Sequence, residues 1–589
     1  MSATKQDRSQ AESGDDATHA GNADARNLPA QQCSHELQVT VKIHSHDDEP
    51  YLFGDTPDED SDFSEPLFRD LGGCRRWSKQ INAFANLCEE TTFLAFELFD
   101  RCGRLNREYC DHVIRKGSGI WGKELDHGDI LLFENMNIEP FGVAREDFFA
   151  FASPMHLTRG LNRNDETLEP RTVYEQSESF KHFFRSLGFR RVGTSEWLAF
   201  ADDDDHPSRR LDKAQDWDNP ERSKEEHLAP ESLRTVLSSL SDSSTSGAEC
   251  VCQMEKVFAV EENMPLWVYI NEMGNTILHV AAISRKADPI PYIMSKAPDL
   301  AGKRNADGYT PSEALQSSLE VQRTRRPRGW GRAAMDVMSD SFEGFCQSDI
   351  ACLAALTGTE IVDLTKLSDR DIWVVSKATD ETASRVPEVI PIRNALRLKY
   401  GCTCGQCIGG FLSPRTRFAL QYQAQFQYDN LDELHSGGSS GLDWVELNGH
   451  ILSHLTEGVR ENLKTNKSMR QGFINMCDHI ARCLGRKRLP DATTVLDFYQ
   501  NQVREWPPVT GNYLERGGTV AAVAMMIFDM VIDQDEWAGD GTIMDVFEDD
   551  LNQLPTCRND HEFDFVSSMC GYERIPTEDF AEFYRRVKE

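Results

Sequence analysis

Apolar positions along the first 200 residues recur with the periods of both strands and helices. In ELQVTVKIH at 36–44 they alternate with polar residues, which predicts a half-buried strand. The apolar runs 130–138 and 148–153 predict two further strands. The stretch SESFKHFFRSL, near 178–187, has helical spacing and ends before Gly188, and FRRVGTSEWLAF after it predicts a short strand. The pattern therefore predicts a mixed α/β domain over 35–200.

Beyond residue 200 the pattern changes twice. Residues 201–250 begin with DDDD and end in a serine-rich run, so we expect a disordered acidic linker there, and likewise a disordered acidic tail at 1–34. From 333 to 589 the apolar spacing is mainly helical, and TVAAVAMMIFDMVI at 519–532 predicts a buried helix. The expected fold class is multidomain, with a mixed-sheet α/β domain, a short repeat segment at 255–320 and an all-α C-terminal region.

An internal repeat marks residues 255–320. GNTILHVAA at 274–282 aligns with GYTPSEAL at 308–315, and their threonines lie 34 positions apart. Both stretches resemble the ankyrin consensus, whose period is about 33 residues. The resemblance makes PIPYIMSK at 289–296 the second helix of a repeat. Because about three repeats are normally needed for stability and two are recognisable, we expect the array to pack against its neighbours. The residues to which the resemblance gives structural roles are Gly274, Thr276, Leu278, His279, Gly308, Thr310 and Pro311.

Four further stretches resemble one group of proteins when they are taken together with the repeat. They are GSGIWGKELDHGDILLFENMNIEP at 117–140, FFAFASP at 148–154, SFKHFFRSLGFRRVGTSEWLAF at 179–200 and KYGCTCGQCIGGFLSPR at 399–415. The group is that of fungal ankyrin-repeat proteins with an N-terminal GNAT acetyltransferase-like domain. The resemblance implies a GNAT-like mixed sheet over 35–200. It also implies acetyl-CoA as the cofactor of any N-acetyltransferase activity.

The cofactor loop of that family is the feature that this sequence lacks. In GNAT enzymes a strand leads into a loop rich in Arg and Gly, whose N–H groups at a helix N-terminus hold the pyrophosphate. Only EPFGVARED stands between the predicted strands 130–138 and 148–153, whereas three helical turns need about eleven residues. Phe184 also stands where many members carry a tyrosine that protonates the leaving thiolate. We therefore expect a degenerate domain with a shortened centre and no catalytic residues, unless a longer isoform retains the loop.

Charge and composition narrow the partners and the compartment. A formal net charge of -34 disfavours nonspecific binding to nucleic acid or anionic membranes and favours basic protein partners. The sequence begins without an apolar signal segment and holds no apolar run of membrane-spanning length, so we expect a cytoplasmic or nuclear protein. There its 16 cysteines would be thiols or metal ligands. The basic run RTRRPRGWGR at 323–332 is expected to be a solvated linker, with nuclear import or RNA contact as the alternative.

A cysteine motif carries the clearest candidate chemistry. GCTCGQC places Cys402, Cys404 and Cys407 as C-x-C-x-x-C in a glycine-rich turn. Zinc prefers tetrahedral sulfur and nitrogen ligands, so these thiolates could share one ion if the chain supplies a fourth ligand. The alternative is a reduced, partly buried thiol cluster without metal. MCDHIARC at 476–483 offers other ligand atoms, but on a helix these face a core. The candidates for the fourth ligand are Cys557, His561 and Cys570.

These observations favour a noncatalytic interaction or scaffold protein that combines a pseudo-acetyltransferase domain with ankyrin repeats. Its partners would be proteins, bound through the repeats and the helical region, and it would need no cofactor other than the zinc considered above. Two alternatives stay open. One is an acetyl-CoA-dependent N-acyltransferase of the GNAT type, and the other is a metal-stabilised C-terminal module.

Overall fold

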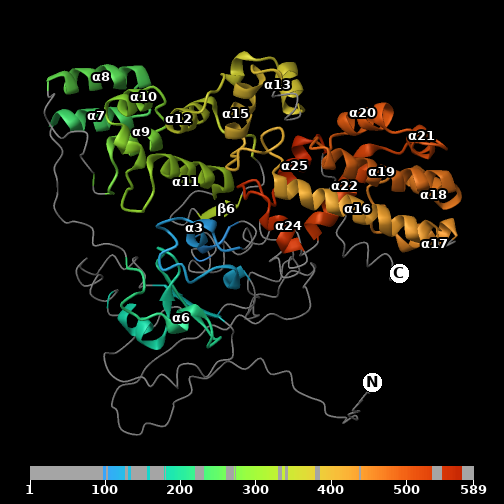
Figure 1. Ribbon diagram of the computed structural model, residues 1–589, viewed down its shortest axis with the longest axis horizontal. Helices are drawn as coiled ribbons and strands as arrows, with labels where there is room; N and C mark the ends of the chain where they lie inside the picture. Colours follow the sequence, from blue (N-terminus) through green and yellow to red (C-terminus); the bar gives the residue numbers. More distant parts are fainter. Residues whose placement is uncertain are drawn as a thin grey trace, which may run out of the picture. The chain divides into compact units, whose positions relative to one another are not determined.

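The computed structural model describes most of the chain beyond residue 103 (Figure 1). All the described residues fall within one compact unit, formed by Val41–Glu134 and Ser153–Glu589. The predicted strand at 36–44, the tail at 1–34 and the apolar run 148–153 lie outside the described residues. The described ranges are 104–126, 131–133, 155–159, 181–218, 231–260, 273–328, 335–338, 342–378, 385–436, 440–533 and 547–572, together with residues 94, 97–100, 178 and 271.

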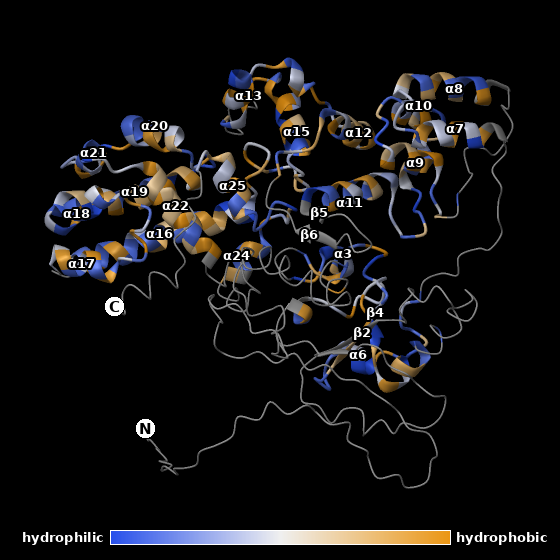
Figure 2. Cartoon of the chain, turned by 180° about the vertical axis from the view of Figure 1, so that it is seen from behind, coloured by the Kyte–Doolittle hydropathy of each residue, from blue (hydrophilic) through white to orange (hydrophobic). Residues whose placement is uncertain are grey.

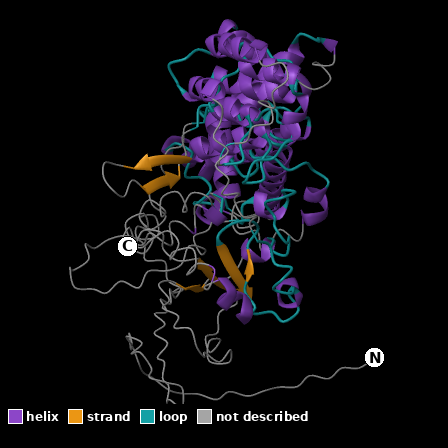
Figure 3. Cartoon of the chain, turned by 90° about the vertical axis from the view of Figure 1, so that its left-hand side faces the viewer, coloured by secondary structure: helices purple, strands orange, loops and turns teal. Residues whose placement is uncertain are grey.

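Helices make up most of the described structure, and the strands form two separate groups (Figure 3). The larger sheet has the order β1-β2-β4-β3, built from Leu131–Phe133, Met155–Arg159, Trp197–Ala201 and Arg190–Arg191. The strand β1 runs parallel to β2, with Leu131 opposite His156, and the other two pairs are antiparallel. The sheet is therefore mixed, as the sequence predicts, and FRRVGTSEWLAF forms two strands of it rather than one.

The parallel pair joins β1 to a strand that begins two residues after the predicted strand 148–153. In the sequence 21 residues, 134–154, separate β1 from β2, and they include EPFGVARED, the nine residues between the two predicted strands. Parallel neighbours need a crossover of about a dozen residues or more, and this length satisfies that need. The predicted strand 148–153 lies outside the described residues, so the shortened centre of the domain stays a prediction.

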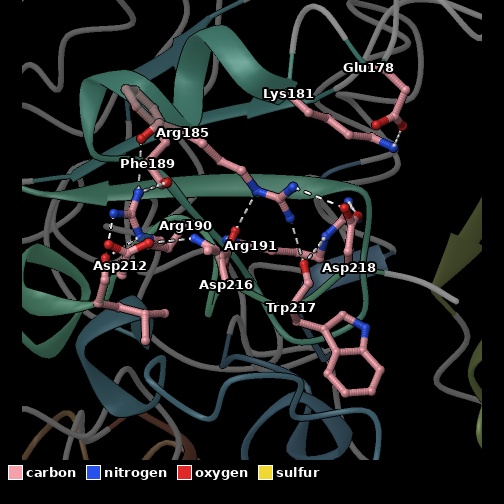
Figure 4. Close-up of polar contacts among 12 residues, drawn as sticks. Glu178, Lys181, Arg185, Phe189, Arg190, Arg191, Asp212, Asp216, Trp217 and Asp218 are labelled. Atoms are coloured by element: carbon pink, nitrogen blue, oxygen red, sulfur yellow. Dashed lines mark hydrogen bonds and ion pairs between the residues drawn. The ribbon is translucent and has the colours of Figure 1, made fainter.

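An arginine and aspartate network fixes residues 211–218 against this sheet (Figure 4). The Nε of Arg185 donates to Oδ2 of Asp216 at 2.8 Å, and its Nη2 donates to the carbonyl of Trp217 at 2.6 Å. Asp216 also accepts from the backbone N–H of Arg191, and Asp218 pairs with both arginines at 3.2 and 3.3 Å. The side chain of Asp216 is fully buried, so its charge depends on these donors.

Residues 201–250 therefore differ from the disordered linker that their composition predicts. Beyond the network they contain the helices α6 (Pro207–Arg210), α7 (Glu231–Ser241) and the start of α8 (Gly247–Val260). Leu233, Val236 and Leu240 follow helical spacing and are fully buried. Serine and acidic residues outnumber these apolar positions, so the composition of the segment does not indicate the helix.

Three helix pairs stack into an array over residues 231–357. The pairs are α7 with α8, α9 (Ile277–Ile283) with α10 (Pro289–Lys296), and α11 (Pro311–Thr324) with α12 (Gln347–Thr357). The first helices pack on one another, and so do the second helices, as the green part of Figure 1 shows for α7 to α10. Turns of successive pairs are also joined, because Lys286 donates to the carbonyl of Asp242 at 2.9 Å and Arg285 pairs with Asp349 at 3.5 Å. The array thus holds one pair before the two predicted repeats.

The repeat residues take well-defined local positions. Thr276 caps α9, and the side chain of His279 accepts from the backbone N–H of Thr276 while its Nε2 donates to the carbonyl of Tyr309 at 2.9 Å. Burial lowers the pKa of His279, so the imidazole is neutral at pH 7. In the next repeat the N–H of Thr310 donates to the carboxylate of Glu313, and the N–H of Glu313 donates to the hydroxyl of Thr310. Pro311 is the first residue of α11. Leu278 is fully buried, and Gly274 has φ +70°.

A β-hairpin interrupts the array after α11. The strand β5 (Arg325–Arg328) pairs antiparallel with β6 (Met335–Met338). The basic run 323–332 is therefore not a simple linker, because four of its residues form a strand and Arg323 is a buried residue at the end of α11.

The C-terminal region is helical, as predicted, and hydrophilic and hydrophobic residues alternate along its helices (Figure 2). Its centre is α19 (Lys467–Gly485), which packs on α16 (Pro414–Ser436), α20 (Ala492–Gln502), α21 (Val509–Glu515) and α22 (Val520–Asp533). The predicted buried helix at 519–532 is α22. In the described part of the chain, no helix combines the length and the apolar character that a membrane crossing requires. The remaining elements are α3 (Arg107–Cys110), η1 (Lys123–Asp126), η3 (Pro298–Gly302), η4 (Leu364–Lys366), α13 (Asp369–Ser376), α15 (Val389–Lys399), α17 (Gly441–Leu447), α18 (Glu457–Thr465), α24 (Glu548–Asn552) and α25 (Phe563–Met569).

The turn at Gly308 gives a test of how the array is held. Gly308 has φ +85°, and a Cβ there would lie 2.7 Å from Cγ2 of Ile114. We expect Gly308→Ala to lower the free energy of unfolding by about 2–4 kcal/mol, from backbone strain plus the displaced Ile114. Gly358→Ala is the matched control, because Gly358 has φ +65° but no atom within 4 Å of such a Cβ. Gly358→Ala should lower the free energy of unfolding by about 1 kcal/mol, from backbone strain without a clash. Urea unfolding of both variants measures the difference, and equal losses would contradict the contact with Ile114.

Candidate metal centre

Four cysteines from two distant segments converge in the C-terminal region. Cys402, Cys404 and Cys407 lie in the cysteine loop, residues 400–413, which joins α15 to α16. Cys557 lies 150 positions beyond Cys407, between α24 and α25, yet their sulfur atoms are 3.5 Å apart. Within the described ranges, this is the group of three or more Cys, His, Asp or Glu side chains whose ligand atoms have the spacing of a metal site.

The sulfur–sulfur distances match a tetrahedron. Cys402 and Cys404 lie 3.7 Å apart at Sγ, and Cys404 and Cys407 lie 3.8 Å apart. All four sulfur atoms lie within 4.8 Å of one another. Zinc–thiolate bonds of about 2.3 Å in a tetrahedron place neighbouring sulfur atoms about 3.8 Å apart. A disulfide needs about 2.05 Å, so the four side chains are free thiols with the spacing of one metal's ligands.

Backbone geometry forms the cysteine loop. At the end of α15 the N–H of Cys402 donates to the carbonyl of Arg397 at 2.9 Å, which turns the chain out of the helix. Gly405 then takes φ +68°, a conformation that L side chains adopt only with strain, and the loop folds back so that Cys404 and Cys407 face each other. Ser413 ends the loop and caps α16, because its Oγ accepts from the N–H of Thr416 at 3.1 Å.

The second segment is held to the loop by buried polar contacts. Asp560 accepts from the N–H of Cys557 at 2.8 Å and from the hydroxyl of Ser413 at 2.6 Å. The side-chain amide of Asn559 donates to the carbonyl of Gly410 at 3.3 Å, while the backbone carbonyl of Asn559 accepts from the hydroxyl of Thr416. These contacts fix the orientation of Cys557 before any metal is considered.

Hydrogen bonds to sulfur indicate that the site is built for thiolates. Thr403 N–H donates to Cys557 Sγ at 3.4 Å, Gln406 N–H donates to Cys404 Sγ at 3.4 Å, and the Asn559 amide donates to Cys407 Sγ at 3.6 Å. Donors aimed at sulfur stabilise the ionised form and are the usual outer contacts of a metal ligand.

The acidity of the thiols leads to the same conclusion. Thiol–thiol contacts, that with Cys402 first, lower the pKa of Cys557 below its ordinary range. Hydrogen bonds with the neighbouring thiols, that with Cys402 first, raise the pKa of Cys404 and Cys407, because there they stabilise the protonated form. A divalent cation removes this conflict, since its charge stabilises all four thiolates together.

The other candidate ligands are placed elsewhere. Cys570 is buried directly after α25, where its N–H donates to the carbonyl of Val566, and burial raises its pKa well above the ordinary value. His561 has φ +64°, and its Nε2 accepts from Arg104 instead of approaching the sulfur atoms. Cys477, His479 and Cys483 face the core along α19, as predicted. The helical spacing of Cys570 with its apolar neighbours is the sequence signal that separates it from Cys557.

The ligand set fits zinc and the structural type of zinc site. Cys407 and Cys557 are nearly inaccessible, Cys402 is buried and Cys404 is half-buried. Four sulfur ligands complete a tetrahedral shell and leave no position for water or substrate, as in structural zinc sites. Soft tetrahedral sulfur sites also accept iron in rubredoxin-like or cluster forms, so the metal's identity follows from measurement and not from the donors alone.

The chain was compared with family models, with curated proteins and with solved structures, and none of the three comparisons found a match.

Metal content tests the site directly. We expect the full chain, purified without chelator, to hold about one equivalent of zinc by elemental analysis, and Cys557→Ser to weaken zinc binding by at least about tenfold. Cys252→Ser is the control, because Cys252 is an exposed thiol outside the cluster. Competition with cobalt, whose thiolate charge-transfer bands report sulfur ligation, measures the affinities. Zinc far below one equivalent in the wild-type chain would contradict the assignment.

Proposed function

We propose that this chain is a noncatalytic interaction or scaffold protein whose helical array is fixed to a zinc-stabilised helical region. The observation that carries the proposal is the closed set of four sulfur atoms at tetrahedral spacing, three from buried cysteines and one from the half-buried Cys404. A complete thiolate shell has a structural role, because it offers no open coordination position for chemistry.

The array supports an ankyrin-like assignment within this proposal. Thr276 and His279 form the reciprocal cap, and His279 reaches the next repeat through Tyr309, as the consensus requires. The three stacked helix pairs meet the usual minimum for such an array. Ankyrin-like arrays serve mainly as protein-binding surfaces, and the net charge of -34 favours a partner with a basic surface.

A patch of exposed apolar side chains follows the array and gives the partner a place to bind. Trp373 and Val374 on α13 are about half exposed, and so is Ile390 on the neighbouring α15. Lys377 lies 4.0 Å above the ring of Trp373, which holds the indole in place while leaving it accessible. Aromatic side chains that are exposed and fixed in this way are typical anchors of protein interfaces.

Substitution of this anchor tests the interaction role. Trp373→Ser in the tagged full chain should reduce the yield of cross-linked partners from a native extract by at least about tenfold, because a lost aromatic anchor costs about 2 kcal/mol or more. Trp506→Ser is the matched control, since Trp506 is 90% exposed but lies in the connection between α20 and α21. Quantitative mass spectrometry compares the two. Equal partner yields from both variants would contradict a role for the α13 surface.

A second candidate function is an acetyl-CoA-dependent N-acyltransferase of the GNAT type. The parallel pairing of β1 with β2 favours it, because a parallel pair joined by a crossover of 21 residues has the length that a cofactor-binding loop and helix need. The argument for a degenerate domain rests instead on the nine residues between the predicted strands 130–138 and 148–153. Phe184 remains a departure from the family, since a phenyl ring has no proton to donate. Its side chain is fully buried.

Calorimetric titration separates the two candidates. Under the scaffold proposal, acetyl-CoA added to the zinc-loaded full chain should give no saturable heat, and CoA release with amine acceptors should equal that of a protein-free blank. Saturable binding near one equivalent together with CoA release above the blank would overturn the noncatalytic assignment. A non-hydrolysable acetyl-CoA analogue that competes in the same titration would serve as the control for specific binding.

A further inference from the structure

Six consecutive residues, 557–562, connect the metal centre to the rest of the chain. We name them the bridging segment. Each of its side chains has partners in other elements, and no two of the six have the same set. Cys557 contacts the cysteine loop, Arg558 contacts α11, Asn559 contacts Cys407, Asp560 contacts Ser413 and Arg107, His561 contacts Arg104, and Glu562 contacts Arg323.

The contacts with α11 lie at both ends of the segment. Arg558 donates to the carbonyl of Gln316 at 2.7 Å and approaches Glu320 at 3.8 Å. Glu562 pairs with Arg323 at 3.4 Å. The second half of α11 is therefore attached to the C-terminal region through Arg558 and Glu562 of the bridging segment.

Arg323 brings α11 against the cysteine loop as well. Its guanidinium is almost completely buried, lies over the rings of Phe342 and Phe565, and would be 3.1 Å from a Cβ placed at Gly401. Gly401 directly precedes Cys402, so a movement of the first ligand displaces the surface on which Arg323 packs. Burying this cation is favourable only while Glu562 and the two rings stay in place.

The segment also holds the N-terminal part of the described chain. Arg107 of α3 pairs with Asp560 at 3.5 Å, and Arg104 donates to His561. Asp560 binds the N–H of Cys557 with the same carboxylate, so the ion pair with Arg107 depends on the position of a metal ligand.

We propose that zinc binding at the four cysteines controls whether α11 and residues 104–107 stay attached to the C-terminal region. This inference rests on the zinc centre of the proposed function. Zinc holds the cysteine loop and the bridging segment together. When zinc is removed, the four sulfur atoms lose the ion that joins them, the bridging segment is held to the loop by the hydrogen bonds of Asn559 and Asp560, and both sets of contacts weaken. The protein thereby converts zinc occupancy into the attachment of its repeat array.

Hydrogen exchange of the full chain measures this coupling. We expect removal of zinc by a chelator to accelerate amide exchange at least about tenfold in α11 and in residues 104–110. The helices α7 and α8 should exchange unchanged, because the hydrogen bonds and ion pairs given above for the bridging segment go to other elements. Restoring zinc should restore the protection. Faster exchange in the cysteine loop alone, with α11 unchanged, would overturn the coupling and leave the zinc centre standing.

Arg558→Ala tests the same idea without changing a ligand. We expect this variant to keep about one equivalent of zinc and to show faster exchange in α11, because its contacts with Gln316 and Glu320 are lost. Arg516→Ala is the matched control, since Arg516 is an exposed arginine of the same region that bonds to Asn512, one turn earlier in the chain. Retained zinc with unchanged exchange in α11 would overturn the coupling. A wild-type chain that binds no zinc would overturn both this inference and the zinc centre.

Discussion

The approach of Cys557 to the cysteine loop is the constraint on which the C-terminal region depends. It closes a stretch of 150 positions, and α16, α19 and α22 lie within that stretch. Closing a chain of this length costs about 4–5 kcal/mol of loop entropy. The contacts of Asn559 and Asp560 contribute about 0.5–1.5 kcal/mol each, so they offset that cost only in part. Zinc binding to four thiolates supplies about 10–16 kcal/mol, which exceeds the closure cost by itself.

The array depends on a second buried contact, made by a cation. The guanidinium of Arg115 lies between the rings of Tyr109 and Tyr309, at 5.2 and 4.9 Å from their centres, and donates to Glu108 at 3.1 Å. Tyr309 also donates to Glu108 and belongs to the turn that His279 binds. Because burial raises the pKa of both tyrosines, the rings stay neutral and the cation is balanced by Glu108 alone. The turn at Gly308 is thereby covered by residues 108–115 of the same chain, so a protein partner would have to bind another surface of the array.

The sequence predicts the local elements well and the connections between distant residues poorly. The helix at 289–296, the cap at Thr276 and the buried helix near 520 follow from spacing and capping chemistry, which act over a few residues. The choice of Cys557 over Cys570 and His561 stays open in the sequence, because it is decided by a fold that joins positions 150 apart. Helix α7 was hidden for another reason: three buried apolar residues stand among serines that dominate the composition. The strand β2, Met155–Arg159, does not follow from the sequence pattern, because its register is set by pairing with β4, some 40 residues later.

Charge pairs join the segments that carry the four cysteines to the rest of the chain. Arg397 donates to the carbonyl of Cys407, and Arg415 donates to that of Leu554, so two cations lie at the backbone of these segments. Arg107 pairs with Asp560, Arg558 approaches Glu320, and Glu562 pairs with Arg323. Since a zinc ion with four thiolates would carry a formal charge of about minus two, arginines near these segments would also stabilise an occupied site. The contacts that attach the array to the bridging segment therefore belong to the same set of charges as those around the proposed metal centre.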